Sequence, residues 1–287
     1  MTLSFINTWQ FNLLGFILFS VIFNQFYKLA VKTVKNDGAA TIIFQTIAGL
    51  SILFLTPFLP ITFPNNWKLY ALLIIACLFY AINDRLQTTV RKNIDVSIYT
   101  VINQLSSVFL ILYGLFIFKE PFYFLKIIGA SLIILANIIL QYSGGKFMFN
   151  KYVLLAALAN LSLATALSID IGISSKFNLP IYIMLTLIIP MILIKNFEKI
   201  KILKIKEEFL RINKFFSFIT GVSWGLLIFF MIRAYQLGSF TLITPLSSTS
   251  VLINVLIATI FLDEKKDILK KILAAVLVIV GVYLTVI

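Results

Sequence analysis

The chain has 287 residues, of which 61% are apolar and 12% charged, and its formal net charge is +13. A soluble domain is nearer half apolar and a quarter charged, so the composition predicts an integral membrane protein. The sequence holds no histidine and one cysteine, Cys77. These counts exclude Ser-His-Asp, Cys-His and His-ligated zinc sites and a disulfide framework. We therefore expect no enzymatic activity, no metal and no cofactor.

Ten segments are long and apolar enough to be expected to cross a bilayer as helices. In chain order they are residues 10–31, 38–58, 69–90, 96–118, 122–141, 151–173, 179–195, 214–234, 240–262 and 268–287. Proline and glycine separate several of them, as at Glu120-Pro121 and Gly144-Gly145. The predicted fold class is an all-α integral membrane protein with ten transmembrane helices.

Two stretches of the chain, 144 residues apart, share one pattern without a gap. The matching residues include Thr100, Ser106, Glu120 and Lys126 in the first copy and Thr244, Ser250, Glu264 and Lys270 in the second. Self-similarity at a fixed period indicates duplication, and five spans per copy would insert the second copy in the opposite sense. We expect two inverted five-helix repeats, residues 1–141 and 151–287, joined by a linker at 142–150.

Most of the 24 Lys and Arg residues fall in the loops that follow odd-numbered spans. Because basic loops mark the cytoplasmic side, both termini are predicted to lie outside, in a cytoplasmic (inner) membrane. We assign the positive charge to this membrane face and expect no nucleic-acid partner. Residues 197–214 read either as an interfacial amphipathic segment or as a charged loop that fixes orientation.

Charged residues inside predicted spans are candidates for a site, since they usually face protein interior or water. Asn83, Asp84 and Arg85 lie on the third span, and Asp170 lies on the sixth. Asp170 either carries a proton or pairs with a cationic substrate, or it forms a fixed ion pair with Arg85 or Lys28. Arg85 either binds a substrate carboxylate or phosphate through its planar fork or forms a structural pair. Lys28 is expected to snorkel to the interface.

Polar side chains also recur on the fourth and ninth predicted spans. Asn103 and Gln104 lie on the fourth, and Ser247 and Ser248 lie on the ninth. Small polar residues either let helices pack closely or line a cavity. Asn103 and Gln104 each carry several donors and acceptors that must be paired, which favours a cavity-lining, substrate-binding role for this pair of helices.

Two further pairs occupy equivalent positions in the copies. Tyr80 and Trp224 would either stack on an aromatic or cationic substrate or serve as packing surface. Glu120 and Glu264 end the fourth and ninth spans. Each either closes a gate by pairing with a Lys or Arg on another helix, or caps and solvates its loop. Asp170 is the third candidate for gating or coupling.

At these residues the sequence resembles a known family. The span ends Phe118-Lys119-Glu120 and Leu262-Asp263-Glu264, with the helices that follow them, and the run that begins Thr244-Pro-Leu-Ser-Ser resemble the EamA-type members of the drug/metabolite transporter superfamily. The resemblance covers nearly the whole chain. It implies ten helices in two inverted repeats around a central cavity, with the fifth and tenth helices peripheral. It also implies that Asp170, Arg85 and the polar runs of the fourth and ninth helices lie where substrate binds.

The chain departs from the family in two respects. Asn83-Asp84-Arg85 carries more charge than is usual within a helix of the family, so the third helix would confer specificity. Many relatives are drawn with both termini inside, whereas the distribution of Lys and Arg places them outside here.

These observations predict a secondary transporter of a small metabolite, such as an amino acid or a related amine or drug, that works by alternating access. The expected partners are the small-molecule substrate and the lipid bilayer, with a homodimer left open. A flippase for lipid-linked sugars is an alternative that would need a lateral opening. A facilitative channel is another, and it would need a continuous polar stripe along several helices.

Overall fold

The computed structural model describes residues 8–59, 61–116, 123–143, 146–147, 150–238 and 240–286. Glu120, one of the predicted gate residues, lies outside these ranges. The first half of the described chain forms α2 (Trp9–Val31), α3 (Asp37–Leu53), the 3₁₀ turn η1 (Thr56–Phe58), α4 (Trp67–Asn93), α5 (Val96–Ile102), α6 (Leu105–Phe116) and α7 (Phe124–Gln141).

A two-residue antiparallel pair, β1 (Tyr142–Ser143) with β2 (Lys146–Phe147), joins this half to the next. The second half contains α8 (Lys151–Ile173), the 3₁₀ turn η2 (Ser174–Lys176), α9 (Leu179–Phe197), α10 (Ile202–Arg211), α11 (Lys214–Leu237), α12 (Phe240–Phe261) and α13 (Ile268–Val286). The fold is therefore all-α apart from this short hairpin.

Asparagine begins many of these helices. The residues at the N-caps of α3, α4, α8, α9 and α11 are Asn36, Asn66, Asn150, Asn178 and Asn213, and each side chain accepts a hydrogen bond from a backbone N–H of the first turn. The cap satisfies a donor that the helix cannot pair internally. The sequence thus fixes the start of a helix by a polar residue placed directly before each apolar run.

Eight helices among the described residues are long and apolar enough to cross a membrane, and two shorter apolar helices, Phe124–Leu140 and Leu246–Phe261, accompany them. The outer surface is apolar as well: Leu14, Ile260 and Leu269 keep more than half of their surface exposed. A soluble monomer rarely exposes large apolar patches. These properties are those of a multi-pass membrane protein.

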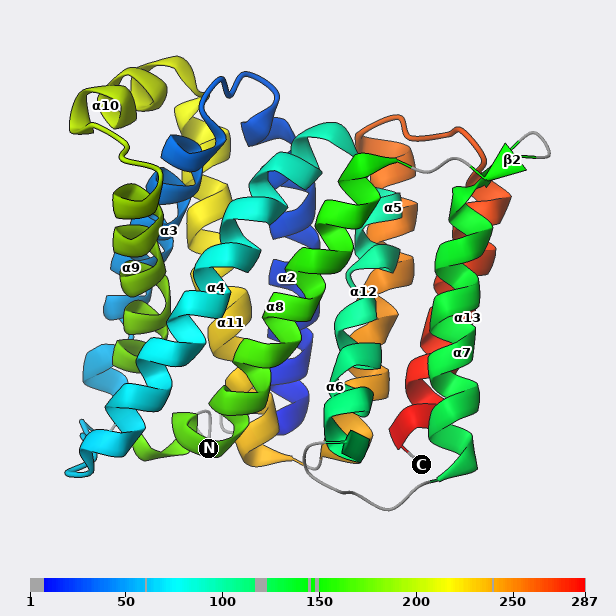
Figure 1. Ribbon diagram of the computed structural model, residues 1–287, viewed down its shortest axis with the longest axis horizontal. Coiled ribbons are helices and arrows are strands. Elements are labelled where there is room, and N and C mark those ends of the chain that lie inside the picture. The colour runs from blue at the N-terminus through cyan, green and yellow to red at the C-terminus, as the bar shows by residue number, and fades with distance from the viewer. Residues whose placement is uncertain are drawn as a thin grey trace.

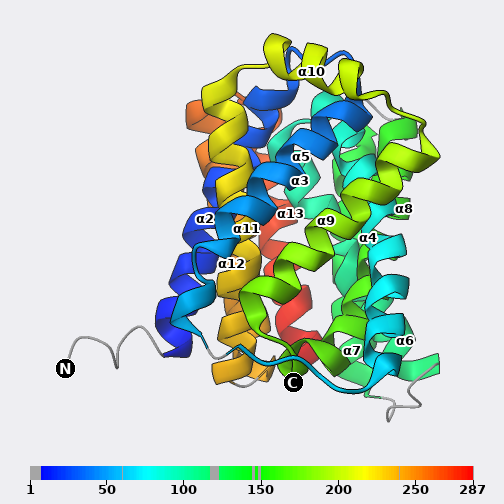
Figure 2. The same cartoon turned by 90° about the vertical axis from the view of Figure 1, so that its left-hand side faces the viewer.

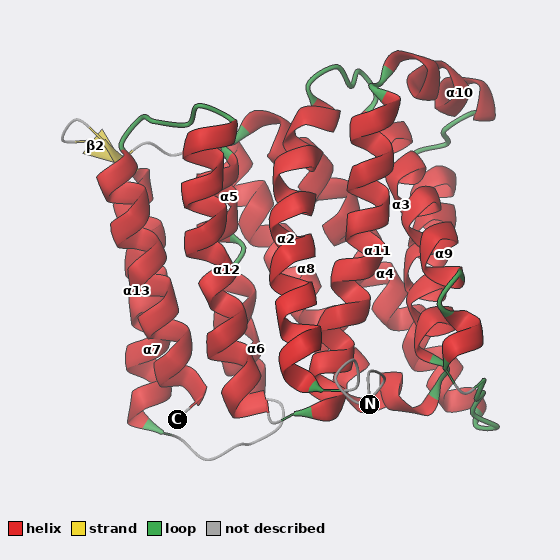
Figure 3. Ribbon diagram, turned by 180° about the vertical axis from the view of Figure 1, so that it is seen from behind, coloured by secondary structure: helices red, strands yellow, loops and turns green. Residues whose placement is uncertain are grey.

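The helices form one bundle with two distinct ends (Figure 1). The first residues of α2 and the last residues of α13 lie at the same end, and α10 lies across the other (Figure 2). α2 packs mainly against α11, α4 against α8, and α3 against α9. α7 and α13 pair at one edge of the bundle, as the view from behind also shows (Figure 3).

The interior is built from two main apolar regions. The larger one joins α2, α3, α9 and α11 around Tyr27, Phe44 and Trp224. The other holds α7 and α13 together, where Gly129 and Gly281 let the two backbones approach so closely that a Cβ on either would meet the carbonyl oxygen of the other. Small residues allow this kind of close contact between membrane helices.

One predicted span differs from the structure, and one segment that the sequence left open forms a helix. The expected fourth span is broken into α5 and α6 at Asn103 and Gln104. Residues 202–211, within the segment that read as either an interfacial helix or a loop, form the helix α10.

Candidate functional site

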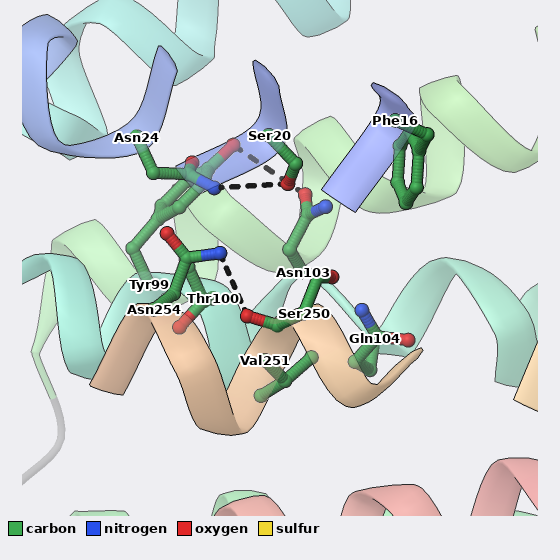
Figure 4. A pocket seen from close by; sticks show the side chains of 10 residues that line it. All are labelled: Phe16, Ser20, Asn24, Tyr99, Thr100, Asn103, Gln104, Ser250, Val251 and Asn254. Carbon is green, nitrogen blue, oxygen red and sulfur yellow. Dashed lines mark hydrogen bonds between the residues drawn. The ribbon is translucent and has the colours of Figure 1, made fainter. Parts of the chain in front are cut away.

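A small polar cavity lies between α2, the junction of α5 with α6, and α12 (Figure 4). Its volume is about 70 Å³. The lining residues are Phe16, Ser20, Asn24, Tyr99, Thr100, Asn103, Gln104, Ser250, Val251 and Asn254. Hydroxyl and carboxamide groups dominate this set, and Phe16 and Val251 supply its apolar part. The cavity therefore joins a helix of the first half, the broken span and a helix of the second half.

The break between α5 and α6 lies at the cavity wall. The amide of Asn103 still donates to the carbonyl of Tyr99 at 2.8 Å, but that of Gln104 turns to Val101 at 3.1 Å, and that of Ser107 to Gln104 at 3.1 Å. The backbone hydrogen bonds thus change from the four-residue spacing of an α-helix to the three-residue spacing of a 3₁₀ turn. Irregular backbone at membrane depth is tolerated where it is buried in protein or lines a cavity. The break therefore belongs to the site.

Carboxamides form the opposite wall. Asn24 Nδ2 donates to Ser20 Oγ at 3.5 Å, and Asn254 Nδ2 donates to the carbonyl of Ser250 at 2.8 Å. Behind them, Gln25 Nε2 donates to the carbonyl of Asn254 at 3.2 Å. The buried oxygen Gln25 Oε1 has no hydrogen-bond partner among the described residues. This wall links α2 to α12 and so joins the two halves of the chain.

A buried arginine lies directly behind the cavity. The Arg91 guanidinium carbon is 4.0 Å from the ring centre of Tyr99, 4.7 Å from that of Phe23 and 4.8 Å from that of Tyr27. Arg91 Nη1 donates to Asn24 Oδ1 at 2.6 Å. Two of these neighbours, Tyr99 and Asn24, also line the cavity. The rings favour a cation over their faces, so they hold the guanidinium in place.

The sequence prediction missed Arg91, because it assigned this residue to a loop after a span ending at residue 90. The structure extends α4 to Asn93 and buries Arg91 to 5% exposure. A signal was present in the spacing: Asp84, Gln87 and Arg91 are separated by three and four residues, which places them on one face of a helix.

Asp84 begins the polar chain on that face of α4. Its carboxylate accepts hydrogen bonds from Gln45 Nε2 at 2.7 Å, Asn83 Nδ2 at 2.9 Å and Gln87 Nε2 at 3.1 Å. Gln87 Oε1 in turn accepts from Arg91 Nε at 3.4 Å. Gln87 therefore connects a buried carboxylate to a buried guanidinium, although the two charges are seven residues apart, or about 10 Å along the helix axis.

Asp170 forms a separate cluster. It accepts hydrogen bonds from Tyr80 Oη at 2.5 Å and from Tyr182 Oη. The suggested fixed ion pair with Arg85 or Lys28 is wrong, because tyrosine hydroxyls from α4 and α9 satisfy the carboxylate instead. Asp170 does not line the cavity.

Arg85 and Lys28 have structural contacts. Arg85 Nε and Glu198 Oε1 form an ion pair at 2.5 Å, with side chains 27% and 36% exposed, and neither lines the cavity. Of the two roles suggested for Arg85, the structure contains the structural pair. Lys28 Nζ donates to three carbonyl oxygens at the end of α4, the nearest being that of Ile94 at 2.7 Å. It therefore caps the C-terminal end of α4.

The remaining predicted site residues divide between the cavity and the packed interior. Asn103 and Gln104 line the cavity, whereas Ser247 and Ser248 are buried on α12 outside the lining set. Trp224 packs on Phe23, with ring centres 5.5 Å apart. It thus supports the aromatic cluster around Arg91 from behind, and its predicted equivalent Tyr80 binds Asp170 instead.

Glu264 caps the broken span. Its carboxylate accepts hydrogen bonds from the amide of Val96 at 2.8 Å and from Ser97 through both the amide at 3.0 Å and the hydroxyl at 2.5 Å. Lys271 Nζ donates to the backbone carbonyl of Glu264 at 3.1 Å and pairs with Asp95 at 3.2 Å. The carboxylate therefore ties the loop between α12 and α13 to the start of α5, and its partners are backbone and hydroxyl groups.

A scan of the chain against protein-family models finds no match, and a search of curated proteins finds none either. No family is therefore assigned, and the resemblance to EamA-type transporters rests on the residues quoted for it above.

Proposed function

We propose that the protein is a secondary transporter that moves a small metabolite, such as an amino acid or a related amine or drug, by alternating access. The observation that carries this proposal is the polar cavity at the break between α5 and α6. Transporters bind their substrates at such discontinuous helices, near the interface of two repeats. Here the cavity joins α2, from the first half, to α12, from the second.

We further propose that ten transmembrane helices form two inverted five-helix repeats. The main support is the pattern of helix pairs. If α2, α3, α4 and α7 correspond to α8, α9, α11 and α13, then exchanging the halves converts the pair α2–α11 into α8–α4, and both pairs are present. The pairs α3–α9 and α7–α13 each join a helix to its own counterpart. A pseudo-two-fold axis accounts for all four pairs.

We assign the end of the bundle that carries α10 to the cytoplasm of an inner membrane, with both chain termini outside. The basic residues support this orientation, since Lys35, Lys201 and Lys265 lie in loops at that end and Lys92 lies in the last turn of α4. Positive charge in short loops is retained on the cytoplasmic side during insertion.

The cavity is too small for a metabolite in this conformation, which favours a moving binding site over a permanent pore. Its volume of about 70 Å³ is several times smaller than that of an enclosed small-molecule site. Pockets that enclose small-molecule ligands usually hold about 300–1,000 Å³. We infer that the halves separate to admit substrate and that the observed state is contracted around the site.

We propose that Glu264 is the gate at the cytoplasmic end. Its bonds to Val96 and Ser97 hold the loop after α12 against α5, directly above the broken span. Release of these bonds would let α12 move away from α5 and open the cavity on that side. Under the repeat, Glu120 would have the same role at the opposite end.

Uptake by vesicles containing the purified protein tests the function. We expect at least one member of a panel of amino acids and amines to enter these vesicles faster than protein-free ones. Asn103→Leu should abolish this flux, because it removes a polar group from the broken span. Asn137→Leu is the matched control: Asn137 lies on α7, outside the cavity, and bonds only its own helix at Ile133. Equal flux for the two variants, or no flux for any solute, would refute the proposal.

A further inference from the structure

The Arg91 guanidinium has no charged partner in the protein interior. Within the described ranges, no carboxylate forms an ion pair with it, and its hydrogen bonds run only to the amide oxygens of Asn24 and Gln87. Asp84, on the same helix, is connected to Arg91 through the hydrogen bonds of Gln87 and not by direct contact. The side chain is nevertheless 95% buried, since only 5% of its surface is exposed.

An arrangement of this kind favours the binding of an anion. Burying a charge without an opposite charge costs several kcal/mol, and the aromatic rings of Phe23, Tyr27 and Tyr99 offset only part of that cost. Guanidinium carries five N–H donors, and two hydrogen bonds to protein acceptors are present. Its fork matches the two oxygens of a carboxylate, which gives the strongest class of hydrogen bond.

The cavity lies next to the Arg91 guanidinium. Asn24 and Tyr99 each contact Arg91 and line the cavity, so a single layer of side chains lies between the guanidinium and the cavity. The hydroxyl groups of Ser20 and Thr100 lie in the same lining, and Phe16 provides an apolar surface. A ligand with an anionic head and a short apolar body fits this distribution of groups.

We propose that Arg91 binds the carboxylate of a small organic acid in this cavity. The guanidinium contacts the ligand when the hydrogen bond from Arg91 Nη1 to Asn24 Oδ1 breaks. The inference rests on the proposed function, because it names the class of substrate that the transporter would take. A monoanion matches the site, since the site offers one guanidinium and Asp84 adds a negative charge to the same polar chain. Asn24 and Tyr99 position the ligand, and Arg91 supplies the charge.

Thermal unfolding of the purified full-length protein with two matched probes tests the proposal. Propionate and propionamide have nearly the same shape and differ in charge. We expect propionate to raise the Tm and propionamide to leave it unchanged, relative to sodium chloride at equal concentration, because a ligand that binds only the folded state stabilises it. Arg91→Gln should lose the propionate shift. Lys92→Gln should keep it, because that neighbouring cation pairs with Asp37 on the surface of α3.

A second variant keeps the test decisive if Arg91→Gln fails to fold. Asn24→Asp would place a carboxylate where Asn24 Oδ1 now lies 2.6 Å from Nη1. The resulting internal ion pair should raise the Tm of the ligand-free protein and abolish the propionate shift, because the protein then supplies the anion itself.

The outcomes separate this inference from the proposed function. Equal shifts with propionate and propionamide, no shift with either, or a full propionate shift in Asn24→Asp would overturn the carboxylate site, even if neutral solutes cross the vesicle membrane. A charge-dependent shift that Asn24→Asp removes would support the site, even if no solute in the panel is transported.

Discussion

Glu264 offers the sharpest test of the gating proposal, because its carboxylate bonds only α5. Replacing it by glutamine keeps the size of the side chain and removes its charge. One carboxylate oxygen becomes an NH₂ group, which is a donor and must face either the amide of Val96 or the amide and hydroxyl of Ser97. The variant therefore loses at least one of the three hydrogen bonds and weakens those that remain.

The magnitude follows from the chemistry of these bonds. A hydrogen bond to a charged group contributes about 1.5–3 kcal/mol. Taking about 2–3 kcal/mol for the net loss, and about 1.4 kcal/mol for each tenfold change in an equilibrium, Glu264→Gln should raise the population open at the cytoplasmic end about 30- to 150-fold. If the substitution destabilises only the closed state, the shift appears in full as accessibility.

Labelling of an introduced cysteine measures this accessibility. Cys77 is the one native cysteine, so Cys77→Ala gives a background in which Ser250→Cys places a thiol in the cavity wall. A membrane-impermeant maleimide, added to vesicles of known orientation, should react faster from the α10 side in Glu264→Gln than in its parent. Glu207→Gln is the control, because Glu207 is an exposed carboxylate on α10.

Two results would refute the reasoning about Glu264. An unchanged labelling rate from the α10 side would mean that the bonds to α5 do not limit opening. Equal acceleration from both sides would mean that the substitution loosens the whole bundle, so that Glu264 only stabilises the fold.

Two further substitutions test parts of the structure away from the cavity. Asp170→Asn replaces by a carboxamide the carboxylate that accepts hydrogen bonds from Tyr80 and Tyr182. If Asp170 carries the coupled proton, the pH profile of flux in vesicles should change. An unaltered pH profile would mean that Asp170 has a structural role only. Gly129→Val should lower the Tm by several degrees, because the added side chain would collide with the backbone at Gly281 and the overpacking would cost about 1–3 kcal/mol. An unchanged Tm would mean that α7 and α13 can move apart without loss of stability.

The sequence predicted the helices well where the apolar run and its polar cap coincide. Residues 151–173, 179–195 and 214–234 became α8, α9 and α11 with small differences at their ends. Length, hydrophobicity and a cap are local properties, and they decide where a membrane helix begins and continues. The same reasoning does not locate the end of α4, where the polar residues that follow residue 90 are stabilised by contacts with other helices.

The parts of the site that escaped prediction all depend on contacts between distant segments. Arg91 is buried because α2 and α5 bring aromatic rings to it. Asp170 accepts hydrogen bonds from tyrosine hydroxyls of α4 and α9, which no spacing in the sequence reveals. The break at Asn103 shows the same dependence, since the apolar pattern around it favours an unbroken helix. Among the residues that line the cavity, the carboxamides Asn103 and Gln104 were the ones that the sequence assigned to it.

Among the described residues between α3 and α4, the only helical element is the 3₁₀ turn η1, whereas α10 lies between α9 and α11, and this makes the two ends of the bundle unlike. Its Glu208 carboxylate accepts hydrogen bonds from the backbone amides of Lys35 and Asn36, each at 3.0 Å, and so ties α10 to the loop between α2 and α3. At the opposite end, the amide of Asn178 donates to the carbonyl of Thr62 at 2.9 Å, a tie that uses no carboxylate. Under the proposed mechanism, opening the two ends breaks different sets of bonds, so the inward-facing and outward-facing forms differ in energy and in population when no solute is present. Such a bias sets which compartment the empty protein faces more often, while the gradients of the solute and of any coupled ion set the direction of net flow.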